Sequence, residues 1–128
     1  MNVYVVEDSP VVQERLVAML RDIPGVVVVG VADNPPEALT AIRRLRPDVA
    51  VLDIRLRGGN GIDLLKGIRS DAPDTTTIIL TSYAHPALRE RCRSAGADHF
   101  FDKSSEFDRI RFVLEAHNEA PASGRLDT

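Results

Sequence analysis

The residues best suited to chemistry are two adjacent carboxylates, Glu7 and Asp8, which directly follow an apolar run at residues 3–6. A third carboxylate, Asp53, follows a second apolar run at residues 49–52. Like charges about 4 Å apart repel by ~4 kcal/mol at an effective dielectric constant of 20, so such a cluster calls for a cation. An all-oxygen donor set suits a hard cation such as Mg²⁺, and no histidine or cysteine lies near enough in sequence to suggest zinc.

Two further segments add a hydroxyl and an amine. Thr81 and Ser82 end the run ILTS, and Lys103 follows the run HFFD. Taken alone, Thr81 is more often an ordinary strand residue and Lys103 an ordinary surface lysine. Together with a bound cation and a carboxylate, however, a hydroxyl and an ammonium form a receptor for a phosphoryl group on that carboxylate.

The elements that must position these residues alternate along the chain. Short apolar or β-branched segments predict strands at residues 3–6, 26–31, 49–52, 77–81 and 98–101. Between them apolar residues recur at three- and four-residue steps, as expected of helices with one buried face. Proline at a first helical position, after Ser9, Asn34 and His85, supports three of the helix starts.

This alternation predicts a three-layer α/β domain with five parallel strands, covered on both faces and joined by right-handed crossovers. In doubly wound sheets, ligands bind beyond the carboxyl ends of the strands, where the strand order reverses. If the order is 2-1-3-4-5, the reversal lies between the first and third strands. Glu7, Asp8 and Asp53 would then converge on one edge of the sheet.

Composition narrows the functional classes. The chain has 128 residues, enough for one domain, and 16 basic residues against 19 acidic ones give a net charge of −3. No basic field predicts direct binding to nucleic acid or membrane, and no apolar run approaches the ~20 residues of a membrane helix. The single cysteine, Cys92, and the absence of a signal-peptide pattern favour the cytoplasm.

Five motifs in the expected order resemble the receiver domain of bacterial two-component response regulators. They are the acidic pair in VVEDSP, the aspartate in AVLDIRLRGGNG, the glycine that ends this stretch, the hydroxyl in ILTS and the lysine in GADHFFDKS. The resemblance covers roughly residues 2–118. It implies the flavodoxin-like, doubly wound (βα)5 fold and supplies the strand order 2-1-3-4-5.

The resemblance also implies a phosphoacceptor module. Asp53 would be the nucleophile that takes a phosphoryl group from a histidine kinase, a phosphotransfer protein or a small phosphodonor. Asp8, Asp53 and the main-chain carbonyl of Arg55 would hold Mg²⁺, and Glu7 would assist through water. Self-phosphorylation and self-dephosphorylation would be its only chemistry, so we do not expect an enzyme.

A switch is implied as well. Thr81 and Lys103 would bind the phosphoryl oxygens, and Phe100 matches an aromatic position that moves inward when the threonine is drawn to the phosphate. A downstream protein effector would read the changed surface. Arg55 and Tyr83, each two residues beyond a site residue, would flank the path of the hydrolytic water and slow loss of the phosphate, unless both side chains point into solvent.

Some features leave alternatives open. Ser104 stands where the family commonly has proline after the lysine, so the geometry of the Lys103–Ser104 peptide is open. The main rival function is a receiver-like scaffold that binds partners without phosphorylation. We expect residues 1–118 to form the domain and 119–128, rich in small and polar residues, to form a disordered tail. We favour a single-domain regulator over a receiver cut from a longer protein.

Overall fold

The computed structural model describes residues 1–126, with side chains described as far as residue 118. Five strands form one parallel sheet in the order β2-β1-β3-β6-β7. Their bounds are Asn2–Val6 for β1, Val27–Ala32 for β2, Val49–Leu52 for β3, Thr76–Thr81 for β6 and His99–Asp102 for β7. The predicted flavodoxin-like fold and its strand order 2-1-3-4-5 are therefore confirmed, with strand ends shifted by one residue in most cases.

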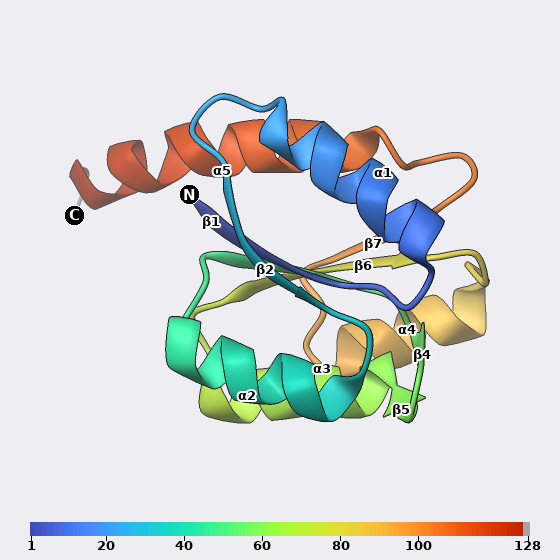
Figure 1. Cartoon of the computed structure of the whole chain (residues 1–128). Coiled ribbons are helices and arrows are strands. Elements are labelled where there is room, and N and C mark those ends of the chain that lie inside the picture. The colour runs from blue at the N-terminus through green and yellow to red at the C-terminus, as the bar shows by residue number, and fades with distance from the viewer. Residues whose placement is uncertain (127–128) are drawn as a thin grey trace.

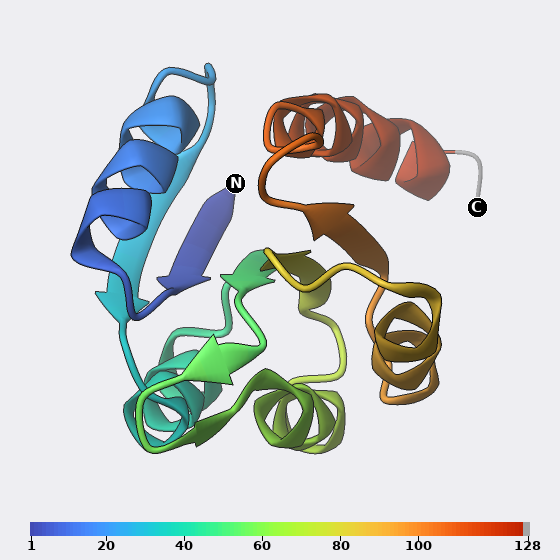
Figure 2. The same ribbon diagram turned by 90° about the vertical axis from the view of Figure 1, so that its right-hand side faces the viewer.

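Helices cover both faces of this sheet (Figure 1). They are α1 Pro10–Arg21, α2 Pro35–Leu45, α3 Gly61–Asp71, α4 Pro86–Ser94 and α5 Arg109–Leu126. In Figures 1 and 2, α1 and α5 lie on one face, and α2, α3 and α4 lie on the other. Two apolar clusters result, one on each face, and the central strands β1 and β3 contribute side chains to both of them.

The helix starts follow the predicted caps. Ser9 and Asn34 accept main-chain hydrogen bonds from Val12 and Glu37, with proline at the first helical positions. His85 caps α4 through its ring nitrogen Nδ1, which accepts a hydrogen bond from the main chain of Leu88. These caps fix the helix starts at the carboxyl edge of the sheet, because every helix in this fold begins just beyond a strand.

A small hairpin after β3 was not predicted. Strands β4 (Arg55–Leu56) and β5 (Gly59–Asn60) pair antiparallel across a two-residue turn. Gly58 in this turn has a φ of 74°, a conformation that residues with a side chain rarely adopt. The hairpin leads directly into α3, so it holds the segment next to Asp53 in place.

Helix α5 is longer than expected. It continues to Leu126, whereas the sequence predicted that the helix ends near residue 118 and that a disordered tail follows. The prediction rested on the proline and glycine of this segment, which have the lowest helix propensities, and its alanines do not outweigh them. Residues 127–128 of the expected tail lie outside the described residues, and the domain boundary at 118 stays a prediction.

Met1 and Asn118 of α5 both lie near the loop between α1 and β2. The amino group of Met1 donates to the carbonyl of Gly25 at 2.7 Å, and the side-chain amide of Asn118 donates to the carbonyl of Pro24 at 3.1 Å. This loop lies at the amino ends of the strands, opposite the carboxyl edge (Figure 1). Among the helices described, none combines the length and apolar character needed to cross a membrane.

Candidate functional site

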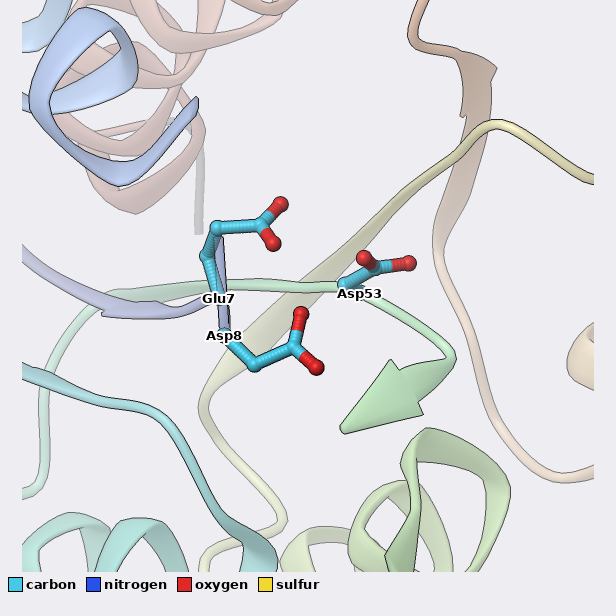
Figure 3. A group of neighbouring side chains, drawn as sticks. All are labelled: Glu7, Asp8 and Asp53. Carbon is cyan, nitrogen blue, oxygen red and sulfur yellow. The ribbon is translucent and has the colours of Figure 1, made fainter. Parts of the chain in front are cut away.

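The carboxyl edge of the sheet brings the three predicted carboxylates together. Glu7 and Asp8 follow β1 and Asp53 follows β3, the neighbouring strand. One oxygen from each of the three lies within 4.8 Å of the others, and Figure 3 shows the side chains extending into the same space. Glu7 and Asp53 are only 2% and 6% exposed, whereas Asp8 is half-buried.

Lys103, which follows the edge strand β7, contacts the same cluster. Its Nζ lies 2.6 Å from Oε1 of Glu7 and 2.7 Å from Oδ2 of Asp53. The main-chain N–H of Lys103 donates to the carbonyl of Thr81 at 2.9 Å, which ties the loop after β7 to the end of β6. The ammonium therefore bridges two buried carboxylates from different strands.

Main-chain donors hold the carboxylates in place. The N–H of Ser9 donates to Oε2 of Glu7 at 3.0 Å, and the N–H of Ile54 donates to Oδ1 of Asp53 at 2.7 Å. Gln13, one turn into α1, donates its side-chain amide to the main-chain carbonyl of Glu7 at 3.0 Å. Sequence reasoning missed Gln13, because a glutamine near a helix start carries no signal that distinguishes it from a solvated one.

Burial and neighbouring charges shift the pKa values of Glu7 and Lys103 in opposite directions. Burial raises the pKa of Glu7 above its usual value, and its bonds from Lys103 and Ser9 offset this only in part. Burial by itself lowers the pKa of Lys103, but bonds to Asp53 and Glu7 outweigh it and hold that pKa above its usual value. Lys103 thus stays positively charged, and Glu7 is costly to keep ionised without it.

Gly61, the first residue of α3, makes room for the loop that carries Asp53. A Cβ at this position would overlap the main-chain oxygen of Asp53 and lie 2.8 Å from Cα of Ile54. The N–H of Gly61 donates to the carbonyl of Ile54 at 2.6 Å, and Asn60 caps the helix. A residue with a side chain would therefore push the β3–α3 segment away from its observed path.

Thr81 and Phe100, the predicted switch residues, are both buried. Thr81 ends β6 with no exposed surface, and its Oγ1 accepts a hydrogen bond from the N–H of Tyr83 at 3.2 Å. Phe100 lies on β7, is 7% exposed and packs in the apolar cluster on the α2, α3 and α4 face. The structure thus holds Phe100 in an inward position.

The side chains of Arg55 and Tyr83 contact each other. The guanidinium carbon of Arg55 lies 3.8 Å from the centre of the Tyr83 ring, in a cation–π stack. The sequence predicted that both residues lie at the rim of the site but gave no sign of this contact, because it joins loops after different strands. The Lys103–Ser104 peptide is trans, since the described residues include no cis peptide bond.

The donor set fits a hard divalent cation. Three carboxylates from two neighbouring strands converge, and no histidine or cysteine accompanies them in the described group. Their mutual repulsion is offset in the structure by a single ammonium, that of Lys103. A divalent cation among the same oxygens would add the positive charge that three anionic groups require.

The fold and this acidic edge define a doubly wound α/β domain with an acidic site at the switch point of the sheet. Residues 3–115 match the family model described as the response regulator receiver domain, and the chain belongs to this family. The predicted resemblance is therefore confirmed. The family consists of signalling domains, and the chain is a two-component receiver.

Known proteins and structures give the same result. The chain is 41% identical over 102 residues to the DNA-binding transcriptional activator DevR/DosR of Mycobacterium tuberculosis, covering 80% of this chain and 47% of that protein. The receiver domain of the response regulator NarL from Mycobacterium tuberculosis superimposes with a TM-score of 0.84 at 30% identity, covering 93% and 96% of the two chains. The receiver domain of Thermotoga maritima CheB has a TM-score of 0.80 at 30% identity, covering 94% and 95%.

The chain spans about half the length of the first curated relatives it matches, with shares of 47%, 55% and 49%. The first two of these relatives are named as a transcriptional activator and a transcriptional regulator, and the third is named as a response regulator. Others are named protein-glutamate methylesterases, of which the chain covers 30% or less in two cases. What all of them share with this chain is the receiver part.

Proposed function

We propose that Asp53 accepts a phosphoryl group in a Mg²⁺-dependent reaction and that this modification switches a surface read by a protein effector. The phosphodonor is a histidine kinase, a phosphotransfer protein or a small molecule. One observation carries the proposal: Asp53 is a buried carboxylate whose Oδ2 lies 2.7 Å from the ammonium of Lys103, within a cluster of two more carboxylates. An aspartate with a purely structural role would not be stabilised by two further carboxylates beside it.

Residues of this chain supply most of the chemistry. An ionised aspartate needs no general base, so an oxygen of Asp53 attacks phosphorus directly, and the bond from phosphorus to the donor breaks as the leaving group departs with its electron pair. Lys103 offsets negative charge on the phosphoryl oxygens, and the hydroxyl of Thr81 donates to one of them. Glu7, kept in place by Ser9, holds Lys103 at the site.

The metal ion would be held by Asp8, Asp53 and the main-chain carbonyl of Arg55, with Glu7 assisting through water. It would neutralise charge on the phosphoryl group while that group is transferred. Mg²⁺ suits such a site because it is bound by few carboxylates and keeps several waters. The half-buried position of Asp8 leaves one side of the cluster open to these waters.

The phosphorylated state would end slowly. Water must approach the phosphorus opposite the Asp53 oxygen, in line with the bond that breaks. We infer that the stacked pair of Arg55 and Tyr83, which follow β3 and β6, would restrict this approach. Stacking also limits the mobility of two long side chains that would otherwise sample solvent.

We also propose what kind of output and partners the chain has. The chain acts without an enzymatic output of its own and without direct contact to nucleic acid; its partners are the phosphodonor protein and a protein effector. Its net charge of −3 supports the second point. The cytoplasmic location expected from the sequence stays a prediction.

The test is modification with acetyl phosphate and Mg²⁺, followed by intact-mass measurement. We expect a labile adduct of about 80 Da, the mass of an added phosphoryl group, that Asp53→Asn abolishes and that chelation of Mg²⁺ prevents. Asp63, which lies on the exposed surface of α3, supplies the matched control, since Asp63→Asn should leave the adduct intact. A chain that binds Mg²⁺ but never gains the adduct would favour the phosphorylation-independent scaffold.

A further inference from the structure

One arginine of α4 contacts Phe100 in two ways. The guanidinium carbon of Arg89 lies 4.7 Å from the centre of the Phe100 ring. Nη1 of the same group donates to the main-chain carbonyl of Phe100 at 3.2 Å. The cation therefore holds both the ring and the backbone of the predicted switch residue.

A third contact links Arg89 to the loop that carries Lys103. Nη2 lies 4.0 Å from Oε1 of Glu106, a partly buried carboxylate in the segment before α5. That same oxygen accepts a hydrogen bond from the N–H of Asp102 at 3.1 Å, while the N–H of Glu106 donates to the carbonyl of Asp102 at 2.8 Å. Asp102 immediately precedes Lys103, so only the carboxylate of Glu106 lies between Arg89 and the loop that carries Lys103.

Phenylalanine gives these contacts their importance. A phenyl ring has no hydroxyl, so the features of Phe100 that can bind a cation are the face of its ring and its main-chain carbonyl. Arg89 binds both of them. A planar guanidinium can stack on a ring and direct separate N–H groups at two acceptors, which an ammonium cannot do.

We propose that Arg89 is the positioning residue that fixes Phe100 in its buried position and connects the Lys103 loop to the outer surface of α4. The half of this inference that concerns signalling rests on the proposed function; the half that concerns the position of Phe100 does not. Because the Arg89 side chain is 53% exposed, a partner bound on α4 would touch the same guanidinium that holds Phe100. The buried ring and the binding surface would then respond to each other.

The first experiment measures the position of Phe100 in the unmodified protein. A para-fluorophenylalanine at position 100 alone is observed by fluorine NMR with a soluble paramagnetic agent, which broadens exposed rings. We expect Arg89→Ala to raise the exposed population of the ring about tenfold, because a cation–π contact and a charged hydrogen bond are lost. Arg89→Lys should recover part of the protection, since an ammonium can still lie over the ring.

The matched control is Arg93→Ala on the same helix. Arg93 is 73% exposed and, among the described side chains, pairs only with Glu90 one turn earlier, so its loss should leave the fluorine signal unchanged. Circular dichroism checks that each variant is folded. A ring in Arg89→Ala as protected as in the parent would overturn the assignment, and so would equal exposure in Arg93→Ala.

The second experiment separates this inference from the proposed function. After treatment with acetyl phosphate and Mg²⁺, Arg89→Ala should gain the Asp53 adduct as the parent does, but amide signals of α4 should shift less than in the parent. Shifts of equal size would disprove the connecting role. A parent that never gains the adduct would refute the proposed function, and the fluorine experiment would still decide whether Arg89 positions Phe100.

Discussion

Lys103 is the only cation that contacts the buried carboxylates among the described residues, and its removal has a predictable cost. In Lys103→Met, Glu7 and Asp53 remain buried without their shared partner. We expect the free energy of unfolding to fall by about 3–5 kcal/mol, the usual cost of leaving a buried charge unpaired. Urea denaturation measures it, with Lys66→Met on the exposed surface of α3 as the control.

The loss in Lys103→Met should depend on pH. Burial already holds the pKa of Glu7 above its usual 4.5, and losing Lys103 removes the largest opposing influence. A carboxyl group with a raised pKa in the folded state favours folding below its unfolded pKa, and this contribution is lost as the pH rises through the folded value. The variant should therefore be closest to the parent near pH 4 and furthest from it near neutrality; a gap that narrows as the pH rises would contradict this account.

The stacking of Arg55 on Tyr83 predicts how long the phosphoryl group stays on Asp53. If it restricts the approach of water, Arg55→Ala/Tyr83→Ala should lose phosphate several-fold faster than the parent, with unchanged affinity for Mg²⁺. The adduct is followed by mass after the donor is removed. Because the two groups contact each other, each single variant should already produce most of the effect. A half-life in the double variant at or above that of the parent would rule out gating.

Among the secondary-structure elements, α3 can begin where it does because its first residue, Gly61, has no side chain. A methyl group at Gly61 would overlap the main-chain oxygen of Asp53, which belongs to the backbone and cannot rotate aside. We expect Gly61→Ala to destabilise the protein by about 2 kcal/mol or more and to slow the modification of Asp53.

Gly67, two turns along the same helix, supplies the control for this change. Its Cβ would meet only the movable end of the Leu39 side chain, at 2.9 Å. Alanine is also the better helix former, so Gly67→Ala should be close to neutral or mildly stabilising. Thermal unfolding of both variants checks the contrast, and equal losses would show that the contact with the Asp53 backbone is not what makes Gly61→Ala costly.

Elements with a periodic pattern were predictable from sequence, and those without one were not. The five sheet strands are apolar runs bounded by caps and prolines, which is why their order of appearance could be predicted. Strands β4 and β5 have two residues each, too few for any alternation to show. The continuation of α5 past residue 118 was missed because proline and glycine in that segment have low helix propensity.

The same distinction holds for the site. Thr81 ends a strand, and Glu7, Asp8, Asp53 and Lys103 each follow one. Their convergence could be predicted, because parallel strands bring their carboxyl ends to one edge. The stack of Arg55 on Tyr83 and the contacts of Arg89 with Phe100 could not. They join side chains from separate segments, and nothing in a single sequence records which rotamers meet.

For the molecule as a whole, Cys92 reports on the integrity of the fold. Its side chain has no exposed surface, lies in the core beneath α4, and burial raises the pKa of its thiol. We expect alkylation by iodoacetamide to be at least about a hundredfold slower than in urea-unfolded protein, because the reagent reaches the buried sulfur only when α4 opens. Mass spectrometry follows the reaction, and labelling of the native chain at the unfolded rate would contradict this packing.

The location of Met1 beside the α1–β2 loop has a practical use. An affinity tag or a surface linker attached before Met1 would project from the amino ends of the strands, where the start of β1 is held to Gly25. The carboxyl edge, with Asp53 and the outer turns of α4, would face away from the support (Figure 1). A biosensor chip loaded through the amino terminus would therefore present the phosphoacceptor side of every molecule to a flowing partner.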